Sequence, residues 1–556
     1  MKKEIRILIT LCVFGACPSC INAQSNTVGL IMNDSTASYN GYTLFAPMTS
    51  TNTYLIDNQG YLIHSWSSAY RPGLGAMLLP DGSLLRTAFL QKGNSFNAGG
   101  SGGRIERYDW DGNLIWSFNY CYPDSCTNHD VAYMPDGDLL MISWERKSYA
   151  DAVAAGRNPS NLGSDLWSEK IIEVKPTGTS GGKIVWEWHV WDHLIQDYDS
   201  TKSNYGSVSA HPELIDLNFG SADEDWLHIN SIRYNPGLDE ILISTHNLSE
   251  IWVIDHSTST AEAAGHTGGK RGHGGDILYR WGNPQAYGAG SQSDQKLYYQ
   301  HDARWIDSGL PGAGDIMIFN NGKDRPEGDY STIEEITPPI DSNGNYYLEN
   351  SGAYGPDTVT WEYKANPANS FYSSHLGGED RLPNGNTLIC EGVDGRFFEV
   401  DSSGNIVWEY INPVSQSGIV AQGDTPQVNM VFKIYRYSAQ YSGLAGKDLS
   451  RKGKIEQYPM GIENNNSQIT GFILNQNYPN PFNPNTTINY QLSTGSNVTL
   501  KVYDILGNLV NTLVNGYKDK GRYKVNFNGS KLSSGVYLYR LVAGRFTDTK
   551  KLILMK

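Results

Sequence analysis

Three histidines, His129, His228 and His301, stand at matching places in a repeated sequence pattern, each where a strand of a hairpin begins. Imidazole serves as nucleophile, as acid or base, and as metal ligand. Asn230 lies two residues after His228, so both side chains share one face of their strand. His246 ends the next strand of that hairpin, which can lie beside His228. Imidazoles with one amide suit an oxyanion such as sulfate, whose oxygens accept hydrogen bonds while one histidine attacks.

Other interpretations of these residues are weaker. For one histidine alone, capping a turn would be the better interpretation, but three in matched register favour a site. Zinc binding is an alternative, yet the histidines show no HxH or HxxxH spacing. Their neighbouring carboxylates, Asp130 and Asp302, are expected to alternate away from the site in extended backbone. Glycoside hydrolysis needs two carboxylates about 5–10 Å apart, and no such pair is evident. We therefore predict no metal and no cofactor in this site.

The elements that position these residues are hairpins repeated between residues 28 and 455. One hairpin of a repeat contains a tight turn, as in MLLPDGSLL and LPNGNTLI, and a second follows, as in FFEVDSSGNIVWEY. Two hairpins make a four-stranded sheet, and radial repetition of such sheets is a β-propeller. The length of this region favours six blades, with five or seven as alternatives, so we predict an all-β protein whose residues 28–455 form a six-bladed β-propeller. Equivalent positions in different blades face one axis, so the three histidines are expected to converge at one mouth of the central channel.

Short motifs in this region resemble those of the bacterial arylsulfate sulfotransferases that use no adenylyl-sulfate (PAPS) donor. In order, they are NHDVAYMPDGDLL, DWLHINS, LYRWGNP, QHDARW, IMIFNNG and LPNGNTLI. The resemblance implies a six-bladed propeller and sulfuryl transfer from a phenolic sulfate ester to a phenol, by a ping-pong route through a sulfated histidine. By motif, His301 is the expected nucleophile. His129, His228 and Asn230 are expected to hold the sulfuryl oxygens, and His129 or His228 to move the proton. His246 stands where the family typically has arginine, so a donor that titrates near neutrality replaces a permanent charge.

Both ends of the chain carry export signals. A basic start and a short apolar stretch end near Ala23, so residues 1–23 are predicted to be a secretory signal peptide. Polar residues 456–476 are predicted to be a linker, and alternating strands over 477–556 predict a small C-terminal β-sandwich. The motifs NYPNPFNPNTTI, VYDILGNLV, SGVYLYRL and KKLILMK resemble the C-terminal sorting domain of type IX secretion cargo. This implies the type IX machinery as partner and passage through the periplasm to the cell surface or medium, often with removal of this domain.

Composition narrows the remaining classes. The 556 residues include 12% aromatic and 18% charged residues, typical of a strand-rich globular protein rather than a disordered chain. A net charge of −15 argues against nucleic acid as a partner. Cys121 and Cys126 either pair in an oxidising compartment or remain as buried thiols. The rival function is a non-catalytic extracellular propeller that binds glycans or proteins, because the fold hosts both. The natural donor, the natural acceptor and the formation of a homo-oligomer remain open.

Overall fold

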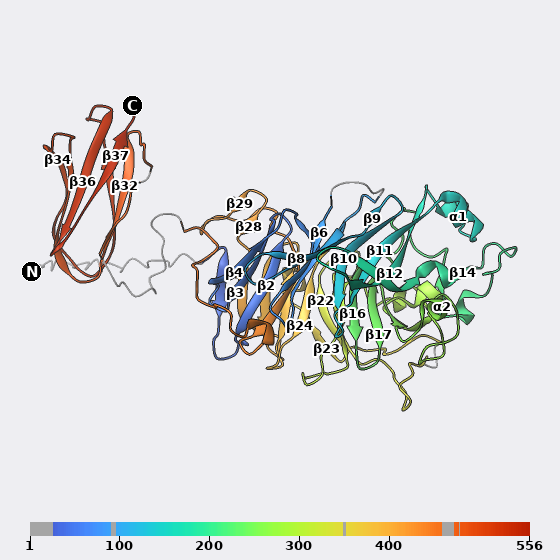
Figure 1. Ribbon diagram of the computed structural model, residues 1–556. Helices are drawn as coiled ribbons and strands as arrows, with labels where there is room; N and C mark the ends of the chain where they lie inside the picture. Colours follow the sequence, from blue (N-terminus) through green and yellow to red (C-terminus); the bar gives the residue numbers. More distant parts are fainter. Residues whose placement is uncertain (1–25, 91–95, 349–351, 459–471, 478) are drawn as a thin grey trace, which may run out of the picture.

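The computed structural model describes residues 26–90, 96–348, 352–458, 472–477 and 479–556 (Figure 1). The predicted signal peptide lies outside these residues, and so does much of the predicted linker. Among the described helices, none combines the length and the apolar character that crossing a membrane requires.

Six antiparallel sheets of the described residues form the blades of a propeller, which confirms the predicted fold. The inner strands of neighbouring blades contact one another in a ring: β30, β5, β10, β16, β20 and β24. Each blade runs outward from its inner strand, and blades are numbered here in chain order. Blade 1 is β30 (Val431–Ser438), β2 (Gly41–Pro47), β3 (Asn52–Asp57) and β4 (Leu62–Ser67); blade 2 is β5 (Pro72–Leu78), β6 (Leu84–Phe89), β7 (Gly103–Tyr108) and β8 (Leu114–Asn119); blade 3 is β10 (Ser125–Tyr133), β11 (Leu139–Lys147), β12 (Leu166–Pro176) and β13 (Gly182–His189), with β9 (Cys121–Tyr122) beside β10; blade 4 is β16 (Ile229–Asn235), β17 (Glu240–Thr245), β18 (Glu250–Asp255) and β19 (Ile277–Trp281); blade 5 is β20 (His301–Trp305), β21 (Ile316–Asn320), β22 (Thr332–Ile336) and β23 (Trp361–Tyr363); blade 6 is β24 (Gly378–Arg381), β25 (Thr387–Glu391), β26 (Arg396–Val400) and β27 (Ile406–Ile411), with β1 (Gly29–Asn33) outermost.

Both ends of the propeller sequence close the ring. The N-terminal strand β1 pairs with β27 in blade 6, where Leu30 faces Tyr410. The late strand β30 pairs with β2 in blade 1, where Tyr42 faces Tyr437. Blades 1 and 6 are therefore each completed by a strand from the far end of the sequence, which leaves neither as a loose terminal sheet.

The hydrophobic cores lie between neighbouring blades, so the strands in the middle of a blade are buried on both faces. The inner-blade strands β21, β22 and β25 are buried at every position, because each blade is covered on both faces. Trp226 is fully buried and Trp305 is 9% exposed, and both belong to these cores.

Two insertions lengthen the chain between His129 and His228. The first lies within blade 3 and contains the short helix α1 (Tyr149–Ala154). The second joins blades 3 and 4 and contains η2 (Val190–Asp192), β14 (Leu194–Ile195), η3 (Val208–Ala210) and β15 (Ile215–Asp216). Blade 4 itself carries α2 (Thr260–Ala263) between β18 and β19. Cys121 and Cys126 form a disulfide where β9 meets β10.

The C-terminal residues form a second β unit with its own core, as predicted. One sheet is β31 (Ile473–Leu474), β32 (Asn485–Leu492) and β35 (Gly521–Asn528). The other is β34 (Leu509–Lys518), β33 (Ser496–Tyr503), β36 (Gly535–Ala543) and β37 (Phe546–Leu554). Apolar side chains of both sheets, among them Ile488, Leu500 and Leu541, meet in one cluster, which is the packing of a sandwich.

Candidate active site

Four imidazoles meet at the inner strands of blades 3, 4 and 5. His129 lies within β10, His228 directly precedes β16, His246 directly follows β17, and His301 begins β20. Neighbouring rings contact one another, with centroids 4.5 Å apart for His129 and His228, 5.0 Å for His228 and His246, and 5.2 Å for His246 and His301. The structure thus brings together the histidines that the sequence repeat placed in register, and adds His246 between two of them.

Irregular backbone aims these rings. The strand register shifts at His129 in β10 and at His301 in β20. It also shifts at the start of β16, immediately after His228. His129, His228 and Asp302 adopt positive φ angles of 43°, 53° and 46°. Such bulges re-aim side chains, and the left-handed conformation of a residue other than glycine costs on the order of 1–3 kcal/mol. Three such residues lie at the inner strands of three adjacent blades. The surrounding structure therefore holds these side chains in place at a cost in backbone conformational energy.

The amide of Asn321 determines which nitrogen of His301 carries hydrogen. Its Nδ2 donates to the carbonyl oxygens of Ser373 (2.7 Å) and Leu376 (2.8 Å), which can only accept. Asn321 Oδ1 is therefore the atom that lies 2.7 Å from His301 Nδ1, and it accepts from that nitrogen. The hydrogen sits on Nδ1, and Nε2 keeps its lone pair. The backbone N–H of Leu376 donates to this Nε2 over 3.3 Å.

The other three imidazoles are held in the same way, each by an oxygen acceptor on Nδ1. For His246 the acceptor is Asn247 Oδ1, whose amide is oriented by a bond from Nδ2 to a backbone carbonyl. Nε2 is thus the nitrogen that faces a ligand in His129, His228 and His246, whereas in His301 it also accepts from the N–H of Leu376. The contacts are His228 Nδ1 to Asp225 Oδ2 (2.5 Å), His246 Nδ1 to Asn247 Oδ1 (2.6 Å) and His129 Nδ1 to Asn128 Oδ1 (3.2 Å).

Burial keeps His129, His246 and His301 uncharged. It lowers the pKa of the His301 imidazole to about 3. Burial, with repulsion from neighbouring imidazoles, also lowers the pKa of His129 and of His246 well below the usual 6.5. At neutral pH these three rings carry no charge, and a neutral imidazole whose Nε2 keeps its lone pair is the nucleophilic form. In His301 this lone pair accepts the 3.3 Å bond from Leu376, which an attack on sulfur would replace.

Asn230 contacts the backbone beside His301. Its Nδ2 donates to the carbonyl oxygen of Gln300 over 2.8 Å, and both residues are fully buried. A side-chain amide has two N–H groups, so one remains for a ligand. Among the described residues, Asn230 Oδ1 has no hydrogen-bond partner. The structure therefore shows Asn230 holding the strand that begins with His301.

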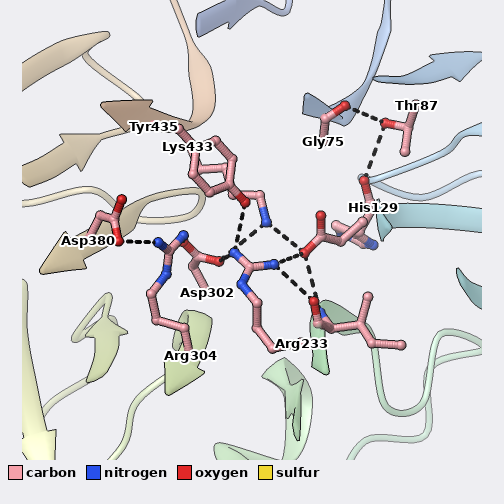
Figure 2. A network of polar contacts seen from close by, with 11 residues as sticks. Gly75, Thr87, His129, Arg233, Asp302, Arg304, Asp380, Lys433 and Tyr435 are labelled. Carbon is pink, nitrogen blue, oxygen red and sulfur yellow. Dashed lines mark hydrogen bonds and ion pairs between the residues drawn. The ribbon is translucent and has the colours of Figure 1, made fainter. Parts of the chain in front are cut away.

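Behind the histidines, a buried ion network joins the inner strands (Figure 2). Lys433 Nζ lies 2.6 Å from Asp130 Oδ2 and 3.3 Å from Asp302 Oδ1. Arg233 reaches the same two carboxylates at 2.9 and 2.5 Å, and Tyr435 at 3.1 Å. The expectation that Asp130 and Asp302 alternate away from the channel assumed extended backbone, but the backbone is left-handed at His129 and at Asp302, and both carboxylates turn toward Lys433. These carboxylates follow His129 and His301 directly, so the network anchors the backbone at two of the four imidazoles.

Several further groups line the cluster and were not singled out from the sequence. Tyr299 is partly exposed, its ring lies 5.0 Å from that of His246, and Lys323 Nζ lies 5.3 Å from the Tyr299 ring. Phe432 is fully buried and packs 6.2 Å from His301. Gly100, at a φ of 81°, lies so close to His129 that a Cβ there would come within 1.9 Å of its ring. Only Gly100 carries a sequence signal, as part of a glycine-rich stretch.

Comparison with protein families matches two regions of the chain. The family described as arylsulfotransferase (ASST) matches residues 31–436, and the secretion system C-terminal sorting domain matches residues 476–555. The match over residues 31–436 indicates a sulfotransferase that acts on aryl substrates. The chain belongs to the arylsulfotransferase (ASST) family, and its sorting domain marks it as a secreted or cell-surface protein.

No curated protein sequence matches the chain. Among solved structures, a protein of unknown function from Bacteroides caccae is 12% identical, with 72% of this chain and 99% of that chain covered and a TM-score of 0.39. The periplasmic gluconolactonase PpgL of Pseudomonas aeruginosa is 12% identical over 72% and 99%, with a TM-score of 0.33. A streptogramin B lyase is 10% identical over 75% and 95%, with a TM-score of 0.35. Likenesses this distant carry no argument about the activity of this chain.

Proposed function

We propose that the protein transfers a sulfuryl group from a phenolic sulfate ester to a phenol, without an adenylyl-sulfate donor, through a sulfated His301. The observation that carries this proposal is the fixed tautomer of His301: Asn321 holds the hydrogen on Nδ1 and leaves an uncharged Nε2. A nucleophile of this kind needs no base to activate it.

In the first half-reaction, His301 Nε2 forms a bond to sulfur and the bond from sulfur to the phenolic oxygen breaks. The leaving phenolate takes a proton from a neighbouring imidazole, for which His228 is the best placed. Asp225 lies 2.5 Å from His228 Nδ1, so a proton on His228 Nε2 makes an imidazolium that a carboxylate already faces. This is the arrangement by which an aspartate supports a catalytic histidine in acyl transfer.

In the second half-reaction, an acceptor phenol gives its proton to His228 and its oxygen attacks sulfur. The bond from sulfur to His301 Nε2 breaks, and the neutral imidazole is restored. His129 and His246 donate to the sulfuryl oxygens once their Nε2 atoms are protonated, and Asn230 has one amide hydrogen left for the same task. The anionic sulfate thus favours protons on His129 and His246, which burial leaves uncharged without it.

A metal at these histidines is a competing idea, and the ligand spacing does not favour it. Among the described residues, the groups of three or more His, Cys, Asp or Glu whose ligand atoms lie within 4.8 Å of one another include none of the four imidazoles. The Nδ1 atoms are in addition already taken by oxygen acceptors.

The test is an assay of 4-nitrophenyl sulfate with and without phenol, in the absence of nucleotide. We expect nitrophenol release that depends on phenol, and loss of that release in His301→Ala. The matched control is His211→Ala, because His211 is exposed and lies on the insertion between blades 3 and 4. Release that ignores phenol, or full activity of His301→Ala, overturns the proposal.

A further inference from the structure

A second cluster of imidazoles and a carboxylate lies at the outside of the propeller, away from the inner strands. His193 follows η2 in the insertion between blades 3 and 4, while His266 and Asp276 lie on the segment that joins β18 to β19. Their ligand atoms all lie within 4.8 Å of one another. Two segments far apart in the sequence therefore meet at three groups that metals prefer as ligands.

The hydrogen bonds of His193 leave a lone pair facing a carboxylate. His193 Nε2 lies 2.8 Å from the carbonyl oxygen of Ala263, which can only accept, so Nε2 carries hydrogen. In a neutral imidazole Nδ1 then has no hydrogen, yet it lies 2.9 Å from Asp276 Oδ1, which has none either. The side chain of His193 is 0% exposed, so water does not relieve this contact. Either a proton or a metal ion must lie between the two atoms.

His266 brings a third ligand atom to the same carboxylate. Its Nδ1 lies 2.8 Å from the same oxygen, Asp276 Oδ1. Protons would join each imidazole to the carboxylate separately, whereas one cation bonds all three atoms at once. Zinc binds nitrogen and oxygen at about 2.0–2.2 Å in tetrahedral geometry, which sets ligand atoms roughly 3.4 Å apart. The observed separations approach this value, so small side-chain shifts would complete the geometry.

The surroundings fix His193 as the partners of a metal ligand do. A ligating histidine almost always donates its other N–H to a carboxylate, a carbonyl or water, as His193 Nε2 does to Ala263. The His193 ring also stacks on Trp188, with centroids 5.5 Å apart and planes 9° from parallel. Gly275 closes the site: a Cβ there would lie 2.0 Å from the carbonyl oxygen of Ala263 and 2.7 Å from His193 Nε2.

A cavity beside the cluster offers access and a fourth ligand. It has a volume of about 620 Å³ and is lined by His266, Asp276, Glu213 and His273 among others. A water molecule, Glu213 or His273 can occupy the fourth position of a tetrahedral ion. His266 is also the most exposed of the three residues, with 60% of its side chain open to solvent.

We propose that His193, His266 and Asp276 form a zinc-binding site that fastens the insertion between blades 3 and 4 to the outer part of blade 4. The site is separate from the histidine cluster on the inner strands and plays no part in sulfuryl transfer.

The experiment measures zinc in the full chain, purified without a histidine tag, by elemental analysis after dialysis against buffer with low micromolar zinc. We expect one zinc per chain in the unmodified protein and in His211→Ala, and none in His266→Ala or Asp276→Asn. Because His266 is exposed, His266→Ala removes a ligand without leaving a cavity in the hydrophobic core. We also expect a rise of a few degrees in Tm with zinc over EDTA for the unmodified protein, absent in His266→Ala.

Two outcomes overturn the site. One is absence of zinc from the unmodified protein together with a Tm that EDTA leaves unchanged, which assigns His193 a proton instead. The other is zinc that stays in His266→Ala and is lost in His301→Ala, which places the metal at the inner histidine cluster. Transfer from 4-nitrophenyl sulfate is expected to be equal in His266→Ala and the unmodified protein. This comparison keeps failure of the zinc site distinct from failure of the proposed function.

Discussion

His246 offers the sharpest test of how the cluster binds an anion, through the substitution His246→Arg. Burial and repulsion by His228 hold the pKa of His246 well below 6.5 in the free enzyme. The hydrogen of its neutral ring is committed to Asn247, so Nε2 can donate to a sulfuryl oxygen only after it takes up a proton. The bound anion favours that proton, so the pKa of His246 is higher in the complex than in the free enzyme.

The sign and size of the effect follow from this linkage. Between the two pKa values, donor binding takes up one proton, and affinity falls as the pH rises. The cost is about 1.4 kcal/mol, or tenfold, for each pH unit. Arginine is charged throughout and donates without proton uptake. Above about pH 6.5, the ratio of kcat/KM in His246→Arg to that of the unmodified protein is expected to rise about tenfold for each pH unit, until the pH reaches the pKa of His246 in the complex.

The assay is kcat/KM for 4-nitrophenyl sulfate at saturating phenol and constant ionic strength, because salt screens exposed charge. His211→Arg is the matched control, since His211 is exposed and lies on the insertion between blades 3 and 4. Its profile is expected to run parallel to that of the unmodified protein. Parallel profiles for His246→Arg would refute the reasoning, because they would mean that the proton taken up with the donor resides elsewhere.

Three further predictions test other parts of the structure. The pKa of about 3 for His301, against 6.5 when unfolded, contributes stability that is present above pH 6.5 and is lost as the pH falls. When the pH falls from 6.5 to 4.5, the free energy of unfolding in urea is therefore expected to drop by roughly 2–3 kcal/mol less in His301→Gln than in the unmodified protein. Equal drops in the two proteins would contradict this. Lys433→Met leaves Asp130 and Asp302 with one cation fewer, and it is expected to lower the free energy of unfolding by about 3–5 kcal/mol in the same assay. The control Lys452→Met removes an exposed lysine and is not expected to lower it. Similar urea midpoints for the two variants would contradict this prediction. A chain that ends at residue 458 is expected to retain transfer activity but to remain unexported in a host with type IX secretion, and its appearance in the medium would show that the sorting domain is dispensable.

Much of the fold could be predicted because local sequence patterns indicate it. Each blade hairpin has a turn with proline, glycine, asparagine or aspartate between apolar strands, and the repetition of such hairpins predicts a propeller. The length of the repeated region favours six blades. The closure of blades 1 and 6 by β30 and β1 could not be read in this way. It pairs strands nearly 400 positions apart, and no local pattern reports which distant strand completes a sheet.

The histidine cluster was predictable for the same reason, since register within a repeat places equivalent residues on one axis. What register could not give is the orientation of each ring. The left-handed backbone at His129 and Asp302 breaks the strand alternation, so Asp130 and Asp302 turn toward Lys433 and the axis. The amide of Asn321, which fixes the tautomer of His301, is a residue whose role depends on two carbonyls elsewhere in the chain.

The most direct test of the sulfated His301 is to mix the enzyme with 4-nitrophenyl sulfate in the absence of acceptor, quench rapidly, and determine the mass of the intact chain and of its peptides. The account predicts a gain of one sulfuryl group on the peptide that contains His301, removed when phenol is added before quenching. A chain that stays unmodified while it turns over donor and acceptor, or a sulfuryl group on His129, His228 or His246 instead, would contradict it.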